Sequence, residues 1–154
     1  MVDRTKRVQA GAPVVDVCFL ADTAAFVLGE ENVLLRAHNG EESRLAVHGG
    51  AILSSAGDGA RIITGGDDGK VMATDANGKS SVIATDAKRR WIDHVATGPD
   101  GAVAWSAGKS AYVMTGKGDP RSLDVVSTVG GLARRKSTRL NSSHIQKSRM
   151  PSSA

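Results

Sequence analysis

The side chains best suited to binding in this sequence gather in one short basic segment. Lys88, Arg89 and Arg90 are followed directly by Trp91. Cations beside an aromatic ring can hold an acidic partner or a phosphate, because the charges attract the anion and the ring adds apolar contact. A solvated basic loop with Trp91 packed at the edge of a sheet would use the same residues. We therefore regard these four residues as a candidate partner-binding site.

Two further segments end like phosphate-binding loops. They are Gly78-Lys79-Ser80 and Gly108-Lys109-Ser110. The motif needs an earlier glycine and a following helix. Neither segment has that glycine, and a strand is expected after the second. Asp67-Asp68-Gly69 lacks the alternating acids and the final glutamate of a calcium loop and is better explained as a hairpin turn.

Histidine and cysteine are too sparse to predict a metal site. His38, His48 and His94 lack ligand spacing, so we expect them to lie in turns or pack within the fold. Cys18 lies in an apolar run and is predicted to be a buried structural thiol. No serine–histidine–acid grouping carries a recognisable nucleophile motif. The sequence thus predicts no catalytic residue, no cofactor and no metal ion.

Charge is spread unevenly along the chain. The 154 residues carry a net charge of +4. Residues 135–154 hold five basic residues and no acid, whereas the chain before them has a net charge of −1. The order of residues in 135–144 and 148–154 resembles the translation of a sequencing adapter. We therefore expect residues 134–154 to be a non-native, disordered tail, and we expect no nucleic-acid partner.

The rest of the chain is repetitive. Three segments, 21–40, 58–78 and 100–118, align with one another, and the closing glycines Gly40, Gly78 and Gly118 are 38 and 40 residues apart. That spacing is close to the ~40–45 residues of a four-stranded propeller blade. Short β-branched runs bounded by glycine-rich and aspartate-rich turns predict strands. No ten-residue window has helical periodicity, so the predicted fold class is all-β.

The second repeat resembles a WD40 repeat. An Asp58-Gly59 turn precedes one predicted strand, a turn through Asp68-Gly69 follows it, and Thr74-Asp75 stands where the family has Trp-Asp. His48-Gly49 lies where that family has its Gly-His signature. The resemblance is to divergent bacterial members, and it implies blades of four antiparallel strands and a buried set of four hydrogen-bonding residues from which the tryptophan is missing.

This resemblance defines the expected domains. Residues 1–13 form an N-terminal segment and residues 14–133 form the propeller part. The repeats cover about 14–50, 51–90 and 91–126, and a fourth begins at 126–133. Closed propellers need roughly 4–8 blades, so about three blades make an incomplete propeller. Both end blades would lack a neighbour, and we expect the chain to self-associate.

Two functions remain open at this point. The first is a protein–protein interaction scaffold without catalytic activity, because propellers present loops on their rims and function lies in those loops. The alternative is a fragment of a propeller enzyme whose active-site residues lie in the missing blades. The polar N-terminus, the lack of a long apolar run and the single cysteine lead us to expect a cytoplasmic protein without membrane contact.

Overall fold

The computed structural model describes residues 4–116 and 118–133. Its strands form three four-stranded antiparallel sheets, in which neighbours follow the order of the chain. The first sheet contains β1 (Val14–Leu20), β2 (Thr23–Leu28), β3 (Asn32–Arg36) and β4 (Glu42–Ala46); the second contains β5 (Ile52–Gly57), β6 (Arg61–Gly66), β7 (Lys70–Asp75) and β8 (Ser80–Thr85); the third contains β9 (His94–Thr97), β10 (Val103–Ala107), β11 (Ser110–Met114) and β12 (Arg121–Asp124). The predicted all-β class and the three four-stranded units are confirmed.

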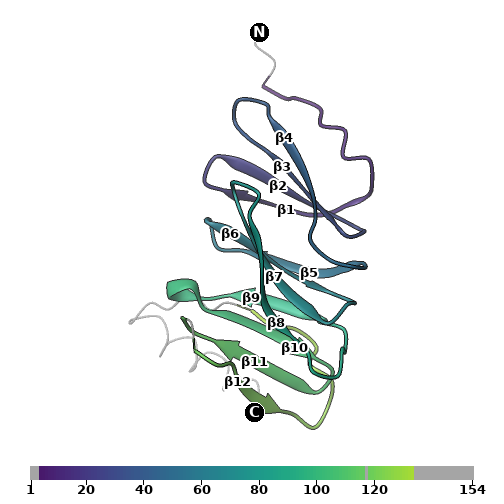
Figure 1. Cartoon of the computed structure of the whole chain (residues 1–154), viewed down its shortest axis with the longest axis vertical. Coiled ribbons are helices and arrows are strands. Elements are labelled where there is room, and N and C mark those ends of the chain that lie inside the picture. Colours follow the sequence, from purple (N-terminus) through teal and green to yellow (C-terminus); the bar gives the residue numbers. More distant parts are fainter. Residues whose placement is uncertain (1–3, 117, 134–154) are drawn as a thin grey trace, which may run out of the picture.

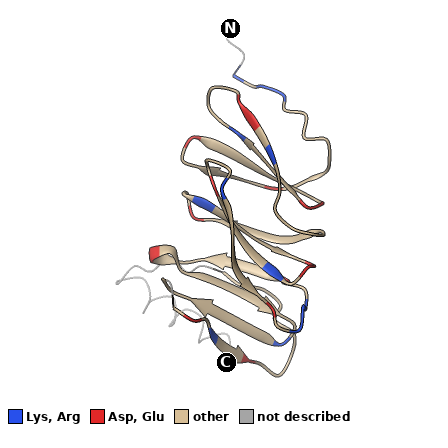
Figure 2. Ribbon diagram, in the orientation of Figure 1, with Lys and Arg blue, Asp and Glu red and all other residues tan. Residues whose placement is uncertain are grey.

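The sheets, which we call blades 1, 2 and 3, are stacked one after another along the long axis (Figure 1). Their first strands lie beside one another, because β1 contacts β5 and β5 contacts β9. Charged residues lie mostly at turns and strand ends (Figure 2). The faces between blades are therefore left to apolar side chains.

Two hydrophobic cores lie between the blades. The first joins Val27, Val33 and Leu35 of blade 1 to Ile62 of blade 2. The second joins Ile63, Val71 and Ala73 of blade 2 to Val95, Val103 and Trp105 of blade 3. Successive residues of a strand point to opposite faces, and so the neighbours Ile62 and Ile63 serve different cores. Blade 2 is consequently covered on both sides.

Trp105 reveals a shift in the third repeat that the sequence alignment missed. Gly57 pairs with Ile62 across the β5–β6 turn, whereas Thr97 pairs with Val103 across the β9–β10 turn. The third turn is thus one residue longer, and it contains the single-turn 3-10 helix Pro99–Gly101.

A shift of one residue moves a side chain to the other face of its sheet. Aligning the two Asp-Gly pairs matched Trp105 with Ile63, which faces blade 3. In the structure Trp105 faces blade 2 and stacks on Tyr112 at a ring-centroid distance of 5.5 Å. The sequence alignment of the third repeat was wrong by one residue over this strand.

The segments outside the sheets lie against the end blades. At the N-terminal end, the Pro13 carbonyl accepts a hydrogen bond from Gly29 N–H at 2.8 Å. At the other end Val129 N–H donates to the Gly108 carbonyl at 3.0 Å. Residues 126–133, expected to open a fourth blade, form no strand. The predicted tail, 134–154, lies outside the described residues.

In the described ranges, no helix is both long and apolar enough to cross a membrane.

Candidate functional site

The candidate basic segment lies in the loop that joins β8 of blade 2 to β9 of blade 3. Two backbone hydrogen bonds hold this loop to the β6–β7 turn: Asp86 N–H donates to the Gly69 carbonyl at 2.8 Å, and Ile92 N–H donates to the Gly66 carbonyl at 3.1 Å. The residues at 67–69 do form a turn between two strands, as predicted, and Gly69 has a φ of 78°. The loop is therefore anchored at both ends to blade 2.

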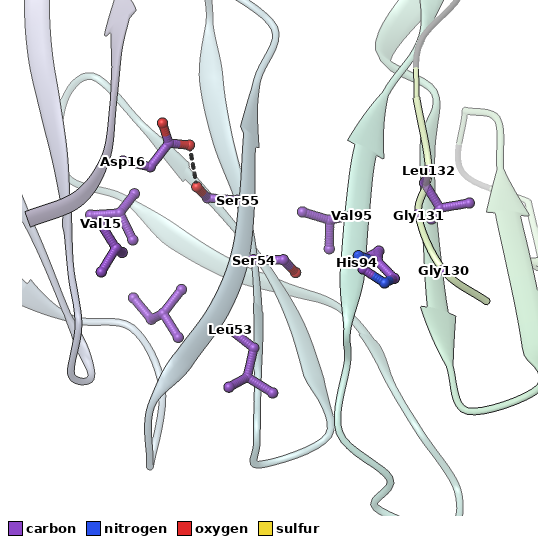
Figure 3. Close-up of a pocket in the computed structure, with 12 residues that line it drawn as sticks. Val15, Asp16, Leu53, Ser54, Ser55, His94, Val95, Gly130, Gly131 and Leu132 are labelled. Atoms are coloured by element: carbon purple, nitrogen blue, oxygen red, sulfur yellow. Dashed lines mark hydrogen bonds between the residues drawn. The ribbon is translucent and has the colours of Figure 1, made fainter. Parts of the chain in front are cut away.

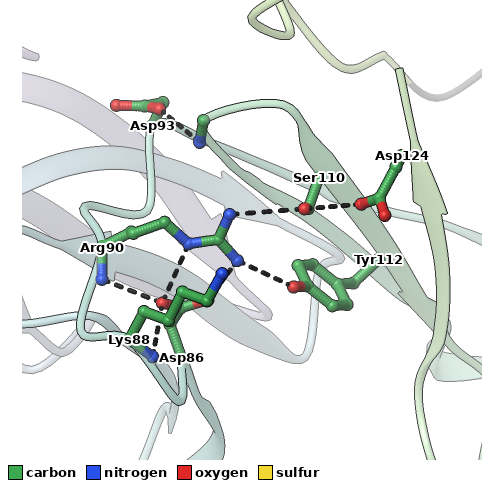
Figure 4. A network of polar contacts seen from close by, with 8 residues as sticks. Asp86, Lys88, Arg90, Asp93, Ser110, Tyr112 and Asp124 are labelled. Atoms are coloured by element: carbon green, nitrogen blue, oxygen red, sulfur yellow. Dashed lines mark hydrogen bonds and ion pairs between the residues drawn. The ribbon is translucent and has the colours of Figure 1, made fainter. Parts of the chain in front are cut away.

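Arg90 links this loop to blade 3 (Figure 4). Its guanidinium donates to Asp86 at 2.9 and 3.1 Å, to the Tyr112 hydroxyl at 3.0 Å and to Ser110 Oγ at 3.3 Å. Ser110 in turn donates to Asp124 at 2.7 Å. One side chain thus bridges a carboxylate of the loop and two hydroxyls of blade 3.

The charge of this network is balanced within the protein. Burial alone would raise the pKa of Asp86, but the hydrogen bonds from Arg90 and from Lys88 N–H outweigh it and lower the pKa below its usual value. Hydrogen bonding to Asp86 raises the pKa of Arg90. Because a carboxylate already neutralises Arg90, that residue acts as a structural part of the loop.

The other three residues of the candidate segment point to solvent. Lys88 and Arg89 are exposed, and the side chain of Trp91 is 61% exposed. Most of the Trp91 side chain is therefore open to solvent. The structure divides the predicted site into one partly buried anchor, Arg90, and an exposed triplet, which we call the loop triplet (Lys88, Arg89 and Trp91).

The preceding loop, between β4 and β5, is held in the same way. Val47 N–H donates to the Glu31 carbonyl of blade 1 at 2.9 Å. His48 then reaches into blade 2, where Nδ1 lies 3.0 Å from Asp68 and Nε2 lies 2.9 Å from Thr64 Oγ1. The expectation that His48 packs within the fold is confirmed. The sequence did not predict that Asp86 and Arg90 link the loop to blade 3. Its only sign of this link is the spacing of the two residues, an acid four positions before an arginine.

These carboxylates lead to a prediction about acid. Burial alone would raise the pKa of Asp68, but hydrogen bonds from Gly49 N–H, His48 and Lys70 N–H lower it overall. The pKa of Asp86 is also lowered in the folded chain. A lowered folded pKa stabilises the fold fully above the unfolded value of about 4, and this stabilisation is lost as the pH falls through the folded pKa.

We therefore expect the urea midpoint of unfolding to decrease as the pH falls below about 4. Asp68→Asn should lower the midpoint at pH 7 and flatten its dependence on pH. Asp22→Asn, at an exposed turn, provides the control. A pH profile that is identical in the Asp68 variant and the parent would contradict this assignment.

A cavity of about 340 Å³ lies where the first strands of the blades meet (Figure 3). Its polar lining comes from Asp16, Ser54, Ser55 and His94, and Ser55 Oγ donates to Asp16 at 2.6 Å. Residues 130–132 close it beside His94. This part of the chain, expected to begin a fourth blade, thus lies next to the first strand of blade 3.

The remaining candidate residues stay apart. His38 is exposed in the turn between β3 and β4, and His94 is half-buried at the start of β9. Cys18 packs against the first core but is only half-buried, so the thiol predicted to be buried is partly covered. Burial, followed by Asp16 and Asp58, raises the pKa of its thiol. Within the described ranges, no three His, Cys, Asp or Glu side chains are grouped so that they could hold a metal ion.

Successive four-stranded antiparallel blades with adjacent first strands define a β-propeller architecture. Solved structures agree with this class. The chain is similar to virginiamycin B lyase from Staphylococcus aureus, a seven-bladed β-propeller, with a TM-score of 0.61 and 9% sequence identity. The match covers 77% of this chain and 43% of that one, so the chain spans less than half the length of this structure.

Two further lyase structures match over the same shares of both chains. A streptogramin B lyase has a TM-score of 0.60 and 12% identity. A catalytically inactive variant of the S. aureus virginiamycin B lyase, with quinupristin, has a TM-score of 0.62 and 14% identity. No protein-family model and no curated protein matches the chain. At these low sequence identities, the structural similarity shows a shared fold.

Proposed function

We propose that the chain is part of a propeller that acts as a protein-interaction scaffold, and that the loop triplet contacts the partner. The observation that carries this proposal is the exposure of Trp91, at 61%, beside two exposed cations. Tryptophan and arginine are the residues most enriched at binding hot spots, and an anchored loop loses little entropy on binding. The two cations favour a partner segment rich in Asp and Glu.

We propose further that the blades are of the WD40 type. The hydrogen bonds between His48 and its partners Thr64 and Asp68 support this, because they join three polar residues where the family has a buried set of four. Thr74, at the position of the missing tryptophan, contacts Ser80 at 2.9 Å instead. Each blade would then have a polar link of its own beside the hydrophobic core.

Binding of a labelled poly-glutamate peptide, followed by fluorescence anisotropy, tests the scaffold proposal. We expect the triple variant Lys88→Ala/Arg89→Ala/Trp91→Ala to lose at least tenfold in affinity, because it removes two charges and the aromatic contact. Lys79→Ala/Lys109→Ala removes two exposed charges elsewhere and is the matched control. Added salt should weaken binding by the parent. Equal affinities for the triple variant and the control would contradict the proposal.

The alternative function is a fragment of a propeller enzyme whose active-site residues lie in the missing blades. The cavity between the first strands supports it as the part of such a site that the described blades would supply. His94, Asp16 and Ser55 supply a base, an acid and a hydroxyl to one space. The similar solved structures are lyases, one of them a catalytically inactive variant with quinupristin. Incubating the chain with quinupristin and following the compound by mass spectrometry tests this alternative. Turnover by this chain that is lost in His94→Ala would show that the described blades themselves carry catalytic residues, and it would favour an enzyme over the scaffold.

A further inference from the structure

The blades of this chain cover one another in a repeated way. We define the leading face of a blade as the face toward the preceding blade, and the trailing face as the opposite one. The trailing face of blade 1, with Val27 and Val33, covers the leading face of blade 2 at Ile62. The trailing face of blade 2, with Ile63 and Val71, covers blade 3. The same interface therefore occurs twice in succession.

The leading face of blade 1 is apolar and open along its first strand. On its outer strand, residues 10–11 of the N-terminal segment lie over Arg44. Val17 and Phe19 are 52% and 65% exposed. The register places them where blade 3 has Val95 and Thr97, which are 7% and 6% exposed because blade 2 covers them. The same positions are thus buried in blade 3 and exposed in blade 1.

The trailing face of blade 3 is open on its outer strands. Val113 and Leu123 are 42% and 65% exposed there. A groove of about 730 Å³ continues inward from Val113 past Ala96 and Ala104, and Ala133 lies at its edge. This face corresponds to the ones that cover a neighbour in blades 1 and 2, and its own neighbour is absent from the described chain.

We propose that two copies of this chain pack head to tail, with the trailing face of blade 3 in one copy covering the leading face of blade 1 in the other. The internal interface continues across the junction, so β1 of one copy would lie beside β9 of the other as β5 does within the chain. Two copies carry six blades, which is within the 4–8 blades of closed propellers, and a ring of two is the expected species. This proposal does not depend on the loop triplet.

Residues 130–133 must move for this contact to form, because they lie beside His94 and Ala96 on the inner part of that trailing face. The backbone hydrogen bond from Val129 N–H to the Gly108 carbonyl directly precedes them. They include Gly130 and Gly131, which lie in open space: a Cβ atom placed on either residue would have no atom of another residue within 4 Å. The segment is therefore loosely packed enough to be displaced.

Light scattering after size-exclusion chromatography, over a hundredfold range of concentration, tests the proposal. The parent should run at twice its 15.9 kDa mass. Phe19→Asp and Leu123→Asp should each weaken association at least tenfold. Val82→Asp, at an exposed position on blade 2 away from both end faces, is the matched control. Circular dichroism should show the same strand content in all three variants.

Mixing the Phe19 and Leu123 variants distinguishes head-to-tail packing from a contact between two identical faces. Each variant keeps one intact face, so the mixture should regain an intact junction and associate more tightly than either variant alone. A chain truncated after Thr128 should associate at least as tightly as the parent. A monomeric parent, an unaffected Leu123→Asp variant, or loss of association on truncation would overturn the proposal.

Discussion

Replacing Arg90 by alanine is expected to lower the free energy of unfolding by about 2–4 kcal/mol. The change leaves the Asp86 side chain, which is 3% exposed, without its counter-ion and removes the bonds to Tyr112 and Ser110. Removing one partner of a buried ion pair costs about 3–5 kcal/mol, and the guanidinium here is 32% exposed, which reduces the loss. Urea unfolding at pH 7 measures this loss.

Arg89→Ala is the control for this experiment. Arg89 carries the same charge one residue earlier but points to solvent, so its loss should change stability by no more than about 0.5 kcal/mol. Equal destabilisation by the two substitutions would show that net charge matters and that the network around Arg90 does not.

Trp105→Ala is expected to cost about 3–5 kcal/mol, the range for a large aromatic removed from a core. Trp105 is 3% exposed and fills the space between blades 2 and 3, where it stacks on Tyr112. The resulting cavity should separate the two blades, because the indole contributes to the core they share. Thermal unfolding followed by circular dichroism provides the measurement.

The second tryptophan provides the matched comparison. Trp91→Ala removes an equally large side chain that is 61% exposed, so it should alter stability by less than about 1 kcal/mol. Comparable losses in both variants would mean that Trp105 does not occupy the interface between blades.

The repeats and turns were predictable because they depend on local chemistry. Asp58 fixes the β5–β6 turn by accepting hydrogen bonds from Ala60 N–H and Arg61 N–H, and Asn77-Gly78 closes the β7–β8 hairpin with a positive φ at Gly78. Short motifs of this kind act within a few residues, so they can be read in the sequence.

The face on which Trp105 lies could not be predicted, because one extra residue in the preceding turn reverses it. The same holds for the division of the basic segment. Four adjacent residues give no sign that Arg90 binds Ser110 and Tyr112, about 20 residues downstream, while Trp91 remains mostly exposed. Such long-range pairings depend on the angle at which blades stack. The sequence pattern identified the loop, and only the packing separated its anchor from its exposed triplet.

Each junction between blades is built from nearby parts alone. A loop binds the turn before it through backbone groups. It binds the blade after it through side chains, which include His48 at the first junction and Arg90 and Asp93 at the second. Among the described residues, the hydrogen bonds of each junction join adjacent blades. The contacts in a junction therefore do not depend on the total number of blades. An ancestral gene could gain or lose a unit of about 40 residues without disturbing the other units. Each blade in such an array is rotated relative to the one before it. The number of blades is therefore set only by ring closure, when the last blade comes to lie beside the first.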